Sequence, residues 1–112
     1  MEDLARIAHD LRIDILKMYY IAQWGHLASA LSCIDILTVL YYGDIFNLNA
    51  RFQANYDRVI LSKGHGCAAW YAILAKLGYF SRQELGTFYQ KNSRLFGLAS
   101  SGVPGIDIPT GS

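Results

Sequence analysis

The segment from Cys67 to Leu77 constrains the fold most, because it is apolar nearly all round until Lys76. A helix of this kind must be covered on most of its sides. The chain has 112 residues, of which 53% are hydrophobic, whereas a small free-standing domain leaves much of its surface in water. We therefore expect other elements to surround this helix, and expect some apolar surface to contact another chain or further sequence.

Before this segment, the pattern predicts two helices. Residues 4–22 place apolar side chains at helical spacing with most charges on the other side, which is typical of an amphipathic helix. Ser32-Cys-Ile-Asp35 has the form of a capping box and predicts a second helix from about Ser32 to Tyr42. Residues 45–56 are expected to form a loop.

The next elements predict a partial α/β unit. Arg58–Ser62 is a short apolar run typical of a buried parallel strand. Ser81–Glu84 is a second capping box, which predicts a fourth helix to about Lys91. From Asn92 onward Gly, Ser and Pro favour irregular structure. Because one strand makes no sheet, the expected class is an incomplete α/β fold that is mostly helical.

Composition excludes several kinds of partner. The formal charge of +1 gives no field that would attract nucleic acid or a membrane surface. Cys33 and Cys67 fit neither a disulfide framework nor a zinc pattern. The N-terminus opens with acids, unlike a signal peptide, and the most apolar stretch, Leu27–Tyr42, is too short to span a bilayer. A cytoplasmic location is expected.

The junction Leu61–Gly66, with the sequence LSKGHG, is the strongest local indication of chemistry. A strand that enters a helix through two glycines directs backbone N–H groups and the positive helix end at a place where anionic cofactors bind. His65 can supply a hydrogen bond or a proton near neutral pH. A tight turn with a helix-capping histidine is the alternative. His26, which follows Gly25, can equally satisfy the last carbonyls of the preceding helix.

Three stretches, taken in order, resemble the N-terminal part of transketolase. They are Gly25–Ser32 (GHLASALS), Asp57–Gly66 (DRVILSKGHG) and Pro104–Ser112 (PGIDIPTGS), and the motif LSKGH is the most specific. The likeness is greatest to transketolases encoded as separate N- and C-terminal subunits. It implies that residues 1–112 form an incomplete part of the domain that binds thiamine diphosphate.

The resemblance also implies an activity, a cofactor and site residues. Transketolases move a two-carbon ketol unit from a ketose (phosphate) to an aldose (phosphate), using thiamine diphosphate with Mg²⁺. By position, His26 matches a histidine that contacts substrate oxygens, and His65 matches one that contacts both the diphosphate and the substrate. Both are therefore expected to be catalytic. Gly111 and Ser112 match the start of a glycine turn over the cofactor, so His65, Gly111 and Ser112 are the expected cofactor-binding residues.

Some features depart from the family pattern. Gly97-Leu-Ala stands where the family has Gly-His-Pro, and Leu98 cannot donate the hydrogen bond of that histidine. No metal ligand is expected in this chain, because the Gly-Asp-Gly segment that holds Mg²⁺ and the glutamate that activates the cofactor are missing. We therefore expect activity only with partner chains in an oligomer. The alternatives are an inactive interaction or regulatory module, or part of another thiamine-diphosphate enzyme such as deoxyxylulose-phosphate synthase.

Overall fold

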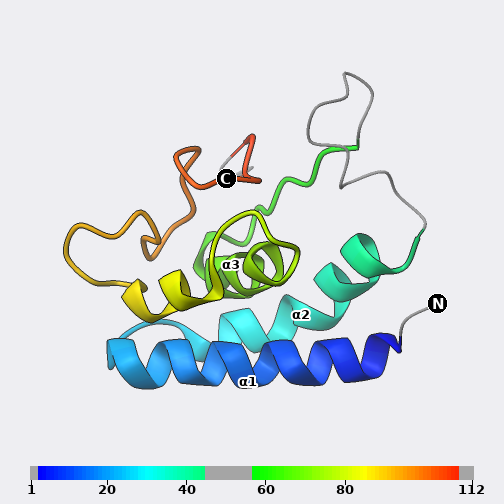
Figure 1. The fold of residues 1–112 in the computed structure, drawn as a ribbon, viewed down its shortest axis with the longest axis horizontal. Helices are drawn as coiled ribbons and strands as arrows, with labels where there is room; N and C mark the ends of the chain where they lie inside the picture. Colours follow the sequence, from blue (N-terminus) through cyan, green and yellow to red (C-terminus); the bar gives the residue numbers. More distant parts are fainter. Residues whose placement is uncertain (1–2, 45–56, 109–112) are drawn as a thin grey trace.

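The computed structural model describes residues 3–44 and 57–108, which form three α-helices and two short 3-10 segments (Figure 1). The α-helices are α1 (Leu4–Ala22), α2 (Leu27–Tyr42) and α3 (Cys67–Lys76), and the 3-10 segments are η1 (Gly64–Gly66) and η2 (Arg82–Thr87). Each α-helix contacts the other two. In Figure 1, α1 runs along the bottom, while α3 is seen nearly end-on in the middle of the molecule. The core therefore lies around α3.

Helix α1 confirms the amphipathic helix predicted for residues 4–22. It begins after Asp3, whose carboxylate accepts hydrogen bonds from the backbone N–H groups of Ala5 (3.1 Å) and Arg6 (3.3 Å). It ends at Gln23, which adopts a left-handed conformation with φ 57°. Its buried face consists of Ile7, Ala8, Leu11, Asp14, Ile15, Met18 and Tyr19.

Helix α2 starts at Leu27, before the start predicted at about Ser32. Ser32 lies inside the helix, where its hydroxyl donates to the carbonyl oxygen of Ser29 (2.9 Å), and Asp35 forms an ion pair with Arg12 of α1. The predicted capping box is therefore wrong. The five residues before Ser32 contain no Gly or Pro and favour helix, which explains the earlier start.

Helix α3 confirms that the apolar segment is enclosed, because every residue from Cys67 to Ala75 is buried. The indole of Trp70 is fully buried, and its N–H donates to the hydroxyl of Tyr41 at 2.9 Å. Gly78, which has φ 92°, follows the helix in a conformation that residues with a Cβ adopt rarely. One helix is thus surrounded by the rest of the described chain.

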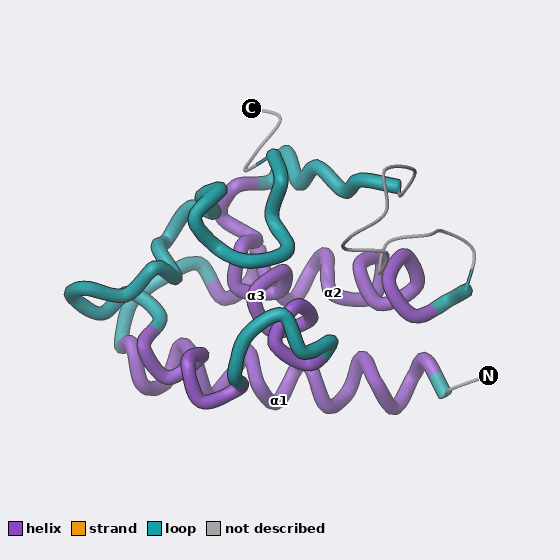
Figure 2. Tube along the Cα trace, turned by 45° about the horizontal axis from the view of Figure 1, so that its top comes forward, coloured by secondary structure: helices purple, strands orange, loops and turns teal. Residues whose placement is uncertain are grey.

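The strand predicted at Arg58–Ser62 is absent from the described residues, where Figure 2 shows helices and loops alone. The segment is an irregular lead-in to η1, and Ile60 within it is exposed. A strand needs the backbone of a neighbour to satisfy its N–H and C=O groups, and the described residues supply none. The segment therefore has the apolar pattern of a strand but no neighbouring strand among the described residues.

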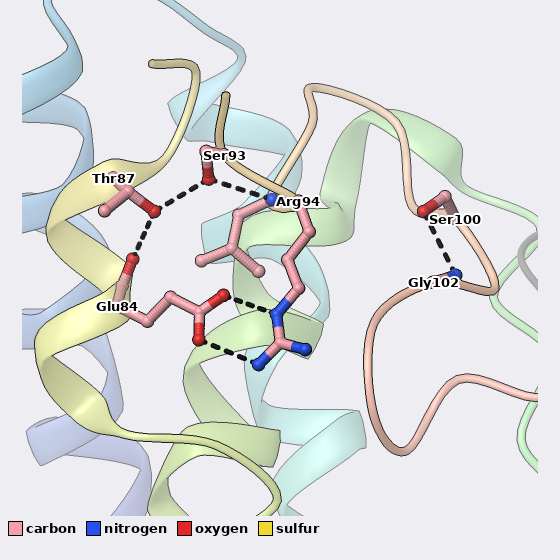
Figure 3. A network of polar contacts seen from close by, with 7 residues as sticks. Glu84, Thr87, Ser93, Arg94, Ser100 and Gly102 are labelled. Atoms are coloured by element: carbon pink, nitrogen blue, oxygen red, sulfur yellow. Dashed lines mark hydrogen bonds and ion pairs between the residues drawn. The ribbon is translucent and has the colours of Figure 1, made fainter. Parts of the chain in front are cut away.

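The fourth predicted helix is shorter than expected. Ser81 caps the segment, since its hydroxyl accepts from the N–H of Gln83 (3.2 Å), but the structure is the 3-10 segment η2 and ends at Thr87 instead of about Lys91. Glu84 does not complete a capping box. Its carboxylate instead accepts two hydrogen bonds from Arg94, at 2.6 and 2.9 Å (Figure 3).

Residues 92–108 are irregular, as predicted, yet they are fixed by polar contacts. The hydroxyl groups of Thr87 and Ser93 lie 2.7 Å apart, and Ser93 Oγ accepts from the N–H of Leu95 at 3.0 Å (Figure 3). Leu95, Val103 and Ile106 are buried. The loop of residues 92–108 therefore covers part of the core.

The loop expected at 45–56 lies outside the described residues. No helix in the described ranges has the length and apolarity to cross a membrane.

The thiol of Cys67 provides a test of this core through pH. Cys67 is 1% exposed, and burial raises its pKa to about 11, against ~8.5 for a free thiol. The neutral thiol thus stabilises the folded state below pH ~8.5, and this stability is lost as the pH rises to about 11. We expect ionisation of this thiol to lower the free energy of unfolding by about 3 kcal/mol between pH ~8.5 and about 11. Urea unfolding followed by circular dichroism measures this change. Cys67→Ala should flatten the decline, and an identical decline in both proteins would contradict this.

Candidate functional site

His26 and His65, the two expected catalytic residues, lie side by side. Their ring centroids are 4.2 Å apart and the ring planes are inclined by 51°. Both side chains are exposed. Within the described ranges, neither imidazole forms a hydrogen bond, so both rings can act on a group from outside.

Two helix starts bring the imidazoles together. His26 occupies the position before α2, where its side chain makes no capping hydrogen bond, and His65 lies in η1 immediately before α3. Segment η1 contacts α2. The first backbone N–H groups of a helix have no partner inside the helix and carry a partial positive charge. The rings therefore stand at the positive ends of two helices, although η1 already satisfies the N–H groups of Gly66 and Cys67 through the carbonyl oxygens of Lys63 and Gly64.

Tyr19 fixes the backbone at His26. Its hydroxyl donates to the His26 carbonyl oxygen at 3.2 Å, and its ring lies under Gly25. A Cβ on Gly25 would stand 2.3 Å from Cε1 of that ring, and the φ of 127° also requires glycine. Phe88 packs edge-on against Tyr19 with 5.2 Å between ring centroids. Sequence patterns gave no sign of this role for Tyr19, because it depends on contacts between helix and loop.

Gly66 and Lys63 hold η1 against α2. A Cβ on Gly66 would stand 3.0 Å from Sγ of Cys33, so glycine allows the two elements to approach. Lys63 donates from its ammonium group to the hydroxyl of Ser32. Gly66 thus allows η1 to lie close against α2.

Leu98 lies at the same corner. Its Cδ2 is 2.9 Å from the position that a Cβ on Gly64 would take, next to His65 in the sequence. The backbone before Leu98 is held by α3: the Tyr71 hydroxyl donates to the carbonyl oxygen of Phe96 at 2.7 Å. An apolar side chain thus packs against Gly64 of η1.

The other site predictions have separate outcomes. Gly111 and Ser112 lie outside the described residues. In the part of the chain that the structure describes, no three His, Cys, Asp or Glu side chains gather to hold a metal ion.

An open depression of about 550 Å³ adjoins His26 and is lined by Tyr19, Gln23, Trp24, Gly25, His26 and Leu27. Two exposed imidazoles at the starts of two helices fit an anionic, oxygen-rich group such as a diphosphate.

Comparisons with known proteins identify the family of the chain. Residues 3–112 match the family described as "Transketolase, thiamine diphosphate binding domain". The chain is 35% identical over 100 residues to one chain of the apulose-4-phosphate transketolase of Phocaeicola vulgatus, covering 88% of this chain and 35% of the relative. It is 36% identical over 91 residues to transketolase 2 of Saccharomyces cerevisiae, covering 80% of this chain and 13% of the relative.

A solved structure shows the same fold. Transketolase from Leishmania mexicana superposes with a TM-score of 0.83 and 25% identity, over 99% of this chain and 17% of that one. The chain therefore belongs to the transketolase family, within its thiamine-diphosphate-binding domain. It spans about a third of the length of the Phocaeicola relative and about an eighth of the yeast relative.

Proposed function

We propose that this chain supplies two histidines to a transketolase-type site that moves a two-carbon ketol unit from a ketose (phosphate) to an aldose (phosphate). Thiamine diphosphate, when bound, supplies the carbon nucleophile that carries the unit. The observation that supports the proposal most is the contact between the exposed rings of His26 and His65, 4.2 Å apart at two helix starts. The family to which the chain belongs indicates the cofactor.

Each histidine has a distinct task in this proposal. His65, beside the N–H groups at the start of α3, donates a hydrogen bond to an oxygen of the diphosphate and to the substrate. His26, at the start of α2, donates to substrate oxygens and passes protons as carbonyl and hydroxyl groups interconvert. Tyr19 and Gly25 keep His26 in reach. Gly111 and Ser112 are proposed to continue the cofactor site.

The proposal requires partner chains in an oligomer. Two relatives, from Phocaeicola vulgatus and Actinobacillus succinogenes, are named as single subunits of apulose-4-phosphate transketolases. We propose that a partner, or the remainder of a longer chain, carries the Mg²⁺ ligands and the glutamate that activates the cofactor. A cytoplasmic location is part of the same proposal.

Reconstitution tests the proposed function. The chain is mixed with a transketolase chain that carries the Gly-Asp-Gly motif and the activating glutamate but lacks this segment. Ketol transfer from xylulose 5-phosphate to ribose 5-phosphate is measured with and without thiamine diphosphate and Mg²⁺. We expect activity that requires both chains and the cofactor. Absence of a cofactor-dependent gain, with association of the chains verified, would contradict the proposal.

One observation favours a second candidate, a non-catalytic interaction module. Helix α1 and the residues that follow it expose several large apolar side chains, which is typical of a surface that contacts another protein. These side chains are Ile13, Leu16, Tyr20, Ile21 and Trp24. If the chain were such a module, His26→Ala and His65→Ala would leave partner binding and activity of the complex unchanged.

A further inference from the structure

The outward face of α1 leaves a row of large apolar side chains in solvent. Ile13, Leu16 and Tyr20 follow one another at helical spacing along this face and are 39%, 49% and 77% exposed. Figure 1 shows α1 along one edge of the molecule, with the other elements on its inner side. Single exposed apolar residues are common, whereas a row of them on one helix is typical of a surface that contacts another protein.

Two charged residues flank this row. In the part of the chain that the structure describes, neither Asp10 nor Lys17 forms an ion pair, whereas the neighbouring Asp14 is paired with Arg82. Seven residues make nearly two full turns of helix, so the carboxylate and the ammonium stand on the same side of α1, about 10 Å apart along its axis. The midpoint between them lies beside Ile13.

A second copy of the chain offers the complementary surface. When two α1 helices pack antiparallel about a two-fold axis beside Ile13, Asp10 of each copy lies level with Lys17 of the other. The same operation places the two Ile13 side chains in contact at the axis. It also brings Tyr20 to Arg6 of the second copy, where the guanidinium can stack on the ring. One symmetric contact thus pairs both charges and covers the apolar row.

We propose that the outward face of α1 is a homodimer surface, in which two copies pack antiparallel through Ile13, Leu16 and Tyr20 with Asp10 of each paired to Lys17 of the other. Contact along α1 buries on the order of 1,000 Å² in total, at the lower limit for a specific interface, so the dimer is weak. The formal charge of +1 gives little repulsion between copies. The proposal does not depend on the proposed function, because it uses none of the residues at the histidine pair.

Charge reversal tests the contact. Analytical ultracentrifugation of the 112-residue chain, from micromolar to submillimolar concentration, should show a monomer–dimer equilibrium. Asp10→Lys and Lys17→Asp each set like charges opposite one another, and each should raise the Kd of the dimer by about 10-fold or more. The double variant restores opposite charges in both pairs, and its Kd should return to within about 3-fold of the wild type.

A second variant and a control complete the test. Ile13→Lys sets two ammonium groups side by side at the axis and should also raise the Kd by about 10-fold or more, with an unchanged circular dichroism spectrum because the position is exposed. Lys91→Asp, at an exposed position outside α1, should leave the Kd unchanged.

Three results overturn the proposal: a chain that stays monomeric throughout, a dimer that Ile13→Lys leaves intact, or a double variant that associates no better than the single ones. A monomeric chain whose α1 face binds the complementing transketolase chain would identify a different occupant, and also overturns it.

Discussion

In the reconstituted enzyme, His65→Ala is expected to lower kcat/KM for ketol transfer by between about 100-fold and about 10,000-fold, as loss of a general acid–base or a charged hydrogen-bond donor does. The exposed ring of His65 stands 4.2 Å from that of His26 beside the first turn of α3. No other residue of η1 carries an imidazole or an amide side chain. Steady-state rates with varied donor and varied cofactor measure the loss.

Three further variants make the interpretation specific. His65→Asn keeps a hydrogen-bond donor without the proton-transfer capacity, and should recover cofactor affinity more than kcat. His26→Ala should also reduce activity, and the double variant should lose less than the two single losses combined, because neighbouring groups do not contribute independently. His9→Ala, at an exposed position on α1, serves as the control. A loss below about 2-fold in His65→Ala, far under the range expected for a general acid–base, would remove the basis for the proposed site.

Trp70→Ala is expected to lower the free energy of unfolding by about 3–5 kcal/mol, a large share of the roughly 5–15 kcal/mol typical of small domains. Trp70 is fully buried in α3, so its removal leaves a cavity, and the Tyr41 hydroxyl loses its contact with the indole N–H. Urea unfolding followed by far-UV circular dichroism measures the change. Partial unfolding in buffer without urea would be a further sign of this loss of stability.

The chain offers a control of the same residue type. Trp24 is 71% exposed, so Trp24→Ala should change stability by less than about 1 kcal/mol. Tyr41→Phe removes only the acceptor of the indole hydrogen bond, and should cost about 1–3 kcal/mol because the N–H remains buried without a partner. Equal effects of Trp70→Ala and Trp24→Ala would show that α3 is not the centre of the core.

Local pattern was sufficient where an element buries a regular face. The apolar period of residues 4–22 predicted α1 with its observed bounds, and the all-round apolarity after Gly66 predicted the enclosed helix α3. Local pattern was insufficient where contacts with residues distant in the sequence determine the conformation. The strand predicted at Arg58–Ser62 has no neighbour to pair with in the described residues, and Glu84 forms an ion pair with Arg94 instead of capping its own helix.

The candidate site shows the same division. Resemblance to a family selected His26 and His65, but their contact exists only because α2 starts at Leu27 and η1 lies against it. The closeness of Gly66 to Cys33 of α2 likewise depends on how the two elements pack. The position of Leu98 against Gly64 depends on hydrogen bonds from α3, which no local pattern reveals.

The enclosure of α3 limits how such a protein can be modified. From Cys67 to Ala75 every residue is buried, so nearly every exchange there must preserve volume or cost stability. The neighbouring segment from Phe96 to Leu98 is attached to α3 through main-chain carbonyl oxygens, which are present whatever side chains the segment carries. Exchanges at the exposed positions 96 and 98 should therefore be tolerated far better than exchanges in the helix beneath them.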